Sequence, residues 1–239
     1  MNHYRLYENL NLTENLRYIP WLPIDIDIDK LQQEYKFICE NYRFEEYSST
    51  HDIVREKYAN AWSGISFISS DGCLYNDLRR GSSISDNHLP TELENYCKYC
   101  FELIDLFFAR KSRCRIMRIS PKSSLVFHSH VLEHGQSENT LTIQIPIEMP
   151  ENFEYCVVEE KEFIKEKRFE PPSSFKNIHR GRLDVGKAYY FNSYHYHNVF
   201  NYSDTYRAAI MLYCDLNDEN VQQLIKKSLV KEGFLTANV

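Results

Sequence analysis

Three histidines stand close together in the stretch FHSHVLEH, residues 127–134. They are His128, His130 and His134, with Glu133 beside the last, in a chain that has nine histidines in all. A lone histidine is more often a hydrogen-bonded surface or core residue than a ligand, but a cluster raises the prospect of a metal site. Imidazole binds zinc, iron, copper and nickel, so the cluster does not fix the metal.

Two histidine pairs have the spacing of neighbours on one face of a β-strand. His128 and His130 form the first pair, and His195 and His197 repeat the spacing in YHYHNV. Residues i and i+2 of a strand point to the same face, so each pair can aim both rings into one space. Two such pairs in one β-rich region favour metal binding over ordinary histidines.

The elements that would position these histidines are short strands. From Arg113 onward the chain consists of brief segments rich in β-branched and aromatic residues, separated by turns such as SPKSS and PPSS: CRIMRI, SSLVF, NTLTIQIPI, FEYCVV, GRLDV, KAYYF and YRAAIMLYC. Seven or eight strands over about a hundred residues are typical of a jelly-roll or barrel. The charged segment 159–177 interrupts this pattern and is predicted to be a solvated hairpin extension or loop.

Helices are predicted on either side of the β region. The apolar spacing predicts a helix over 29–44 with Asp29 as its cap, a helix over 91–110 opened by a Thr91–Glu94 capping box, and a final helix over 217–233. Residues 62–69 predict a further strand. We therefore expect a mainly β (α+β) single domain over residues 1–239, with a helical N-terminal region (residues 1–112), a β core (residues 113–216) and a C-terminal helix (residues 217–239).

Composition narrows the class of partner. The net charge is −6 and no Lys/Arg block could follow a phosphate backbone, which argues against nucleic acid. No run reaches the length of a membrane span, and the N-terminus has no apolar leader segment. The seven cysteines form no repeating frame, and Cys97 and Cys100 fall in a predicted helix, as ordinary core residues would. A cytoplasmic protein with reduced thiols is the simplest expectation.

The ordered motifs resemble a known family. RISPKSSLVFH (118–128) and GKAYYFNSYHYHNVFNYSDTYRAAIMLYCD (186–215) are similar to the core of the aspartyl/asparaginyl β-hydroxylase-like proteins, which are 2-oxoglutarate- and Fe(II)-dependent oxygenases on a double-stranded β-helix. The matching positions, in chain order, are Pro121, His128, Gly186, His197-Asn198-Val199, Asn201 and Arg207. The resemblance covers roughly residues 113–216.

The resemblance implies roles for these residues. His128 and His197 would ligate the metal, with His130 as the third ligand, and Arg207 would bind the far carboxylate of 2-oxoglutarate. Guanidinium suits that task because it binds carboxylate through two parallel hydrogen bonds and keeps its charge. The cofactors expected are Fe(II) and 2-oxoglutarate, with O₂ as co-substrate.

Two positions depart from the family pattern. His130 stands where an Asp or Glu ligand is usual, so the third ligand is His130, Glu133 or water. On the strand TLTIQIPI, Thr142 and Gln144 stand where the family often has a basic Arg-x-His pair. Gln144 can hydrogen-bond a carboxylate without neutralising it, and both residues are expected to contact the cofactor.

Three functions remain open on the sequence. The first is a 2-oxoglutarate-dependent hydroxylase acting on an amino acid, a peptidyl residue or a related small molecule. The second is a three-histidine dioxygenase of the cupin type that uses O₂ without an oxoacid. The third is a non-catalytic jelly-roll module that binds zinc, for which three histidines and a water would suffice. The role of His195 and the oligomeric state stay open.

Overall fold

The computed structural model describes residues 21–22, 24–46, 61–76, 87–128, 140–158, 175, 178–191, 196–215, 217–231 and 233. Several residues singled out in the sequence lie outside these ranges: His130, Glu133, His134, His195 and nearly all of the charged segment 159–177.

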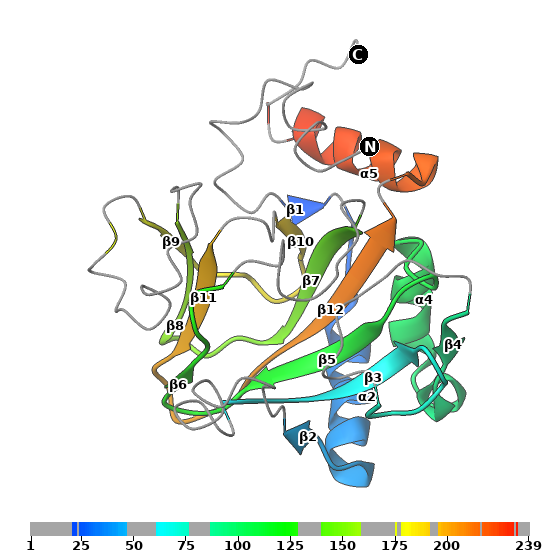
Figure 1. Ribbon diagram of the computed structural model, residues 1–239, viewed down its shortest axis with the longest axis horizontal. Helices are drawn as coiled ribbons and strands as arrows, with labels where there is room; N and C mark the ends of the chain where they lie inside the picture. Colours follow the sequence, from blue (N-terminus) through cyan, green and yellow to red (C-terminus); the bar gives the residue numbers. More distant parts are fainter. Residues whose placement is uncertain are drawn as a thin grey trace.

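The described strands form two antiparallel sheets (Figure 1). The larger sheet has the order β1-β10-β7-β12-β5-β3-β2, with β4 paired to β3. Its strands are β1 (Trp21–Leu22), β2 (Glu45–Glu46), β3 (Trp62–Ser69), β4 (Leu89–Pro90), β5 (Cys114–Ile119), β7 (Thr140–Glu148), β10 (Ala188–Phe191) and β12 (Arg207–Asp215). The smaller sheet, in the order β6-β11-β8-β9, contains β6 (Ser123–Ser124), β8 (Phe153–Val158), β9 (Ile178–Gly181) and β11 (His197–Asn201).

The strand order is that of a double-stranded β-helix. Along the chain from β5 to β12, four strands enter the larger sheet (β5, β7, β10, β12) and four enter the smaller one (β6, β8, β9, β11). The predicted mainly β fold with flanking helices is therefore confirmed. Strand β3 pairs with β5 over most of its length, so the larger sheet extends upstream of residue 113.

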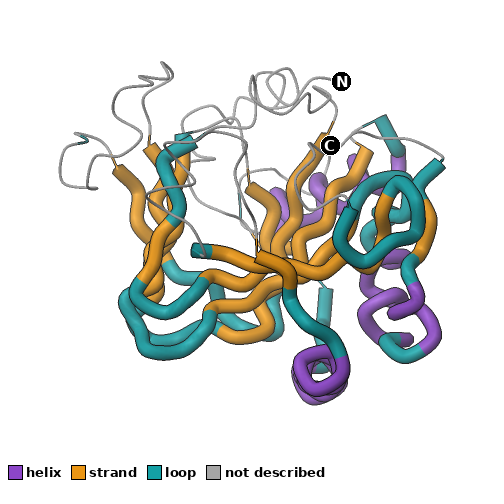
Figure 2. Tube along the Cα trace, turned by 60° about the horizontal axis from the view of Figure 1, so that its bottom comes forward, coloured by secondary structure: helices purple, strands orange, loops and turns teal. Residues whose placement is uncertain are grey.

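Alternation along the strands separates a core face from an inner face. On β12 the residues Ala208, Ile210, Leu212 and Cys214 belong to the main hydrophobic core, which also contains buried residues of the helices. The intervening residues therefore point to the opposite face, toward the smaller sheet. Figure 2 shows the helices on the outer side of the larger sheet, away from the smaller one. The space between the sheets is thus left to residues such as Arg207 and Tyr213.

Helix α2 (Ile28–Asn41) confirms the first predicted helix. Its buried residues Leu31, Tyr35 and Ile38 form the expected stripe. The cap differs from the prediction, because Asp27 rather than Asp29 accepts a hydrogen bond from the backbone N–H of Lys30 (3.1 Å).

The predicted helix over 91–110 is only partly correct, because the chain forms two shorter pieces there. A 3₁₀ turn (Glu92–Asn95) precedes helix α4 (Lys98–Leu106). The Thr91 hydroxyl makes no cap, since it donates to the Ser66 carbonyl instead (2.9 Å). The start of α4 is capped from α2: the Glu34 carboxylate accepts from the backbone N–H groups of Tyr99 (2.7 Å) and Cys100 (2.8 Å).

The last helix, α5 (Glu219–Lys231), confirms the C-terminal prediction and is followed by Gly233 at φ +79°. Among the described residues, no helix is long and apolar enough to cross a membrane. All seven cysteines are free thiols, and Cys97 and Cys100 are buried as the sequence suggested.

Candidate active site

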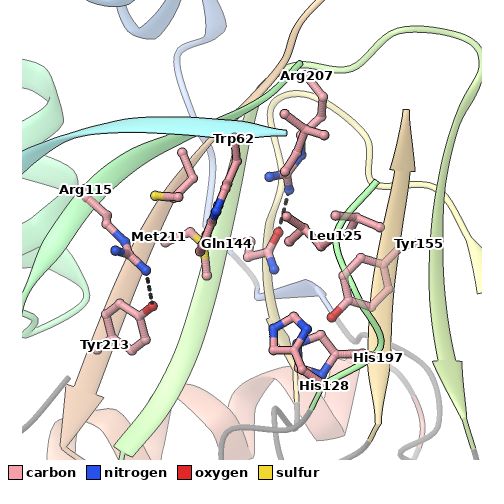
Figure 3. A pocket seen from close by; sticks show the side chains of 13 residues that line it. Trp62, Arg115, Leu125, His128, Gln144, Tyr155, His197, Arg207, Met211 and Tyr213 are labelled. Atoms are coloured by element: carbon pink, nitrogen blue, oxygen red, sulfur yellow. Dashed lines mark hydrogen bonds between the residues drawn. The ribbon is translucent and has the colours of Figure 1, made fainter. Parts of the chain in front are cut away.

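Two of the predicted ligands, His128 and His197, lie side by side between the sheets. Their backbones form an isolated antiparallel bridge: His128 N–H donates to the His197 carbonyl (3.0 Å), and His197 N–H donates to that of His128 (2.9 Å). The ring centroids are 4.4 Å apart, with the planes at 51°. Both rings line one cavity (Figure 3). Distant segments of the chain therefore supply two imidazoles to one point.

Each ring has a described neighbour that restrains its position. The Nδ1 atom of His128 is 2.7 Å from the Val126 carbonyl oxygen. A carbonyl only accepts, so this contact assigns a proton to Nδ1. The His197 ring stacks on the Tyr155 ring, with centroids 6.2 Å apart and planes at 13°. Both rings are thus held in place before any metal binds.

The described residues bring two potential metal ligands, His128 and His197, to this point. No group of three His, Cys, Asp or Glu side chains lies close enough to hold a metal within the described ranges. His130, the predicted third ligand, falls outside them. The donor set on view is therefore a pair of imidazoles, a ligand type that suits iron, zinc, copper or nickel.

The cavity beside the histidines is small and mixed in character. Its enclosed volume is about 50 Å³, and the whole recess, including the part open to solvent, measures about 480 Å³. Its apolar wall consists of Trp62, Met117, Ile119, Leu125, Val199 and Met211. Its polar residues are Arg115, His128, Gln144, Tyr155, His197, Arg207 and Tyr213. No carboxylate side chain occurs in this lining, so the described wall is cationic.

Arg207, for which the sequence predicts oxoacid binding, lines this cavity and is only 2% exposed. Its Nη2 atom donates to Gln144 Oε1 (2.5 Å), and its guanidinium lies over the Phe153 ring at 5.2 Å from the centroid. The Nε–H has no hydrogen-bond partner among the described residues. Burial lowers the pKa of Arg207 to about 10, against a smaller opposing effect from Tyr155. A buried cation that is only partly satisfied by a neutral amide is suited to receive an anion.

The two predicted residues of β7 take different positions. Gln144 lines the cavity and contacts Arg207. Thr142 lies two residues away on the same strand face, opposite Tyr213 in the register, and is fully buried without being part of the cavity wall. Of this pair, Gln144 alone stands where a cofactor carboxylate could contact it.

Arg115 is a second cationic group in the cavity, and the sequence did not predict it. Arg115 is 4% exposed, and its Nη2 lies 3.4 Å from the Tyr213 hydroxyl. Its guanidinium also lies over the Trp62 ring at 5.6 Å, while that of Arg113 lies over the Tyr213 ring at 5.5 Å. Burial raises the pKa of Tyr213, but Arg115 and Arg113 together outweigh it, so the net shift is downward. The sequence signal that could have identified Arg115 is that arginines recur within and just before the otherwise apolar strand β5.

Two other positions of the family pattern have structural roles. Gly186 adopts φ +85°, and a Cβ there would lie 2.6 Å from Ile28 Cδ1, so the turn before β10 needs glycine. The Asn201 side chain donates to the carbonyls of Ile119 (3.2 Å), Ser120 (3.0 Å) and Thr205 (2.8 Å). These residues hold the strands that carry the site without entering it.

No family model and no curated protein matches the sequence. Solved structures do match the fold. AviO1 from Streptomyces viridochromogenes is 11% identical over 85% of this chain and 93% of its own, with a TM-score of 0.50. The chain shares its fold with AviO1.

Two further solved structures give weaker matches. One is an oxidoreductase of the 2OG-Fe(II) oxygenase family from Burkholderia pseudomallei, 15% identical over 78% of this chain and 76% of that one, with a TM-score of 0.43. The other is the non-heme alpha-ketoglutarate-dependent epimerase SnoN from nogalamycin biosynthesis, 10% identical over 89% and 84%, with a TM-score of 0.48. None of these comparisons singles out the aspartyl/asparaginyl β-hydroxylase-like family.

Proposed function

We propose that the protein is a 2-oxoglutarate- and Fe(II)-dependent oxygenase. His128 and His197 are the metal ligands, and Arg207 binds the far carboxylate of the oxoacid. The observation that carries this proposal is that a bridged pair of imidazoles and a buried, partly unsatisfied guanidinium line the same cavity. A ligand that chelates a metal at one end and carries a carboxylate at the other is complementary to that arrangement.

When bound, iron and the oxoacid supply an overall oxidation in which R–H, O₂ and 2-oxoglutarate give R–OH, succinate and CO₂. The protein must leave coordination positions open for these reactants, and few protein ligands do so. The hydrogen bond from His128 Nδ1 to the Val126 carbonyl orients that ring, as a second hydrogen bond commonly does for a metal-binding histidine. Whether the third ligand is His130, Glu133 or water decides how positive the metal centre is.

Arg207 supports oxoacid binding by exchanging partners. In the structure, Gln144 Oε1 accepts from Nη2. A carboxylate can accept from Nη2 and from the unpartnered Nε on the same edge of the guanidinium, while the Gln144 amide supplies an N–H donor. Gln144 offers Arg207 only a neutral acceptor, whereas a carboxylate brings a negative charge. That charge stabilises the guanidinium cation, which burial disfavours.

The class of substrate is inferred from the sequence resemblance. Pro121, His128, Gly186, His197 and Arg207 support a place near the aspartyl/asparaginyl β-hydroxylase-like enzymes. The substrate would then be an amino acid, a peptidyl residue or a related small molecule. Gln144 replaces one member of the basic pair common in that family, so substrate contacts are expected to differ from those of its members.

Anaerobic spectroscopy tests the proposal. Addition of Fe(II) and 2-oxoglutarate to the protein should produce the weak visible charge-transfer band of a chelated oxoacid. His128→Ala and His197→Ala should abolish the band. Arg207→Gln should raise the Kd for 2-oxoglutarate about 100-fold, because it removes one partner of a buried charge pair. Arg180→Gln is the matched control, since that arginine is exposed and paired with Glu154.

Two results would redirect the assignment. Zinc retained through chelator treatment, with no band under Fe(II), would identify a zinc-binding module. O₂ consumption that is independent of 2-oxoglutarate would identify a three-histidine dioxygenase, in which Arg207 binds the substrate carboxylate instead. Succinate release under O₂ that fails in Arg207→Gln supports the oxygenase over both.

A further inference from the structure

We propose that Arg115 and Tyr213 form a second anion subsite, which binds the carboxylate of a small organic acid with an apolar body. This acid is the substrate of the proposed oxygenase. Its identification as the substrate rests on that proposed function. The carboxylate lies at the Arg115 end of the cavity, and the apolar body extends from there toward His128 and His197.

The geometry of this end supplies matched donors. Arg115 Nη2 and the Tyr213 hydroxyl lie 3.4 Å apart, and both residues are buried and line the cavity. Guanidinium carries five N–H donors, and the tyrosine hydroxyl adds one that can turn toward an oxyanion. The Arg113 guanidinium over the Tyr213 ring adds a second positive charge beside it. An oxyanion here meets hydrogen-bond donors and positive charge together.

This subsite is separate from the one at Arg207. Arg207 opens β12 and Tyr213 lies six residues further along it, so their backbones are about 20 Å apart in an extended strand. Figure 3 shows the Arg115–Tyr213 pair and the Arg207–Gln144 pair on opposite sides of Trp62. A five-carbon oxoacid spans roughly two residues of extended chain. Held by Arg207 and a metal at the histidines, it leaves the Arg115 end to another ligand.

The walls between the two ends suit an apolar body. Trp62 presents an aromatic face that also contacts the Arg115 guanidinium, and Met117 and Met211 line the same space. Methionine adapts to varied apolar shapes because its chain is unbranched and polarizable. The donors described at this end, one guanidinium edge and one hydroxyl, match the two oxygens of a carboxylate better than the three of a phosphate monoester.

Calorimetry without iron tests the subsite. The probes are benzoate, phenylacetate, 3-phenylpropionate and 4-phenylbutyrate, each beside its uncharged amide, added to protein saturated with 2-oxoglutarate. At least one acid should bind ten or more times more tightly than its amide. Arg115→Gln should remove this preference, Arg115→Lys should retain some of it, and Tyr213→Phe should weaken it several-fold. Arg180→Gln should change nothing.

Three results would overturn the subsite: acids that bind no better than their amides, a preference that survives Arg115→Gln, or phenyl phosphate that binds more tightly than every acid. Loss of the preference in Arg207→Gln, but not in Arg115→Gln, would place the acids in the oxoacid site and would also contradict the proposal. Tyr213→Phe removes only a hydroxyl, so it still tests the subsite if Arg115→Gln fails to fold. A normal oxoacid charge-transfer band without any acid preference would refute the subsite and leave the oxygenase assignment standing.

Discussion

Arg207 is a residue at which binding and stability oppose each other. Burial lowers its pKa to about 10, below the usual range of an arginine, so the folded chain disfavours the charged form. The charge is present in both states below pH 10, and its cost to folding is therefore fully present at neutral pH. The cost is relieved only as the pH rises above about 10, toward the ordinary pKa of arginine, because the unfolded chain binds more protons in that range. The shift corresponds to on the order of 3 kcal/mol.

Removing Arg207 together with Gln144 should therefore stabilise the ligand-free protein. In Arg207→Met/Gln144→Leu both partners of the hydrogen bond are replaced by apolar groups, so neither is left unsatisfied. We expect Tm at pH 7 to rise by roughly 5 °C, with loss of the stabilisation that 2-oxoglutarate gives the wild type. Thermal melts with and without the oxoacid measure both effects. A lower Tm in the double variant would show that Arg207 contributes to folding by contacts other than those described.

At the residue scale, comparison with the family motif predicted which residues lie at the site. His128, His197, Gln144 and Arg207 all line the one cavity, although their roles stay predictions. Arg115 was not found, because a short apolar strand does not reveal which of its faces points inward. That choice is made by pairing with distant strands, here β3 on one side and β12 on the other.

At the scale of elements, helix starts depended on partners far along the chain. The sequence around Thr91 contains a capping pattern, yet the hydroxyl donates to the Ser66 carbonyl on β3. The actual start of α4 is set by Glu34, a residue of α2 that is distant in sequence. Local patterns therefore predicted that a helix exists in this region, and tertiary contacts determined where it begins.

Glu34 should consequently be more important for stability than its partly buried helix position suggests. Glu34→Ala removes two hydrogen bonds to the backbone N–H groups of Tyr99 and Cys100, along with a negative charge at a helix N-terminus. We expect the free energy of unfolding to fall by about 1–2 kcal/mol in urea titrations. Glu40→Ala is the control, because that exposed residue of the same helix has only a long contact to Lys36. Equal effects of the two substitutions would mean that the cap contributes nothing.

At the scale of the whole molecule, the density of short strands was enough to predict a mainly β, jelly-roll-like core. It was not enough to predict that β3 joins the larger sheet, since residues 62–69 are separated from β5 by helix α4. The inner space between the sheets could not be anticipated from periodicity either. It exists because the larger sheet turns one face to the helices and keeps arginines, a glutamine and a tyrosine on the other.

The two sheets are joined by Asn201, and this tie can be tested directly. Asn201 lies at the end of β11 in the smaller sheet, and its amide donates to the carbonyls of Ile119 and Ser120 at the end of β5 and to that of Thr205. Asn201→Ala removes three hydrogen bonds at once, although Ser123 and Ser203 hydroxyls still donate to the Ser120 and Thr205 carbonyls. We expect the free energy of unfolding to fall by about 2–4 kcal/mol. Asn198→Ala, on the same strand and similarly buried, loses one described hydrogen bond and should cost about 1 kcal/mol.

Chemical denaturation of both variants measures the two losses of unfolding free energy. If they are equal, Asn201 does not join the sheets. If Asn201→Ala also weakens 2-oxoglutarate binding, the same connection sets the spacing between His197 and Arg207.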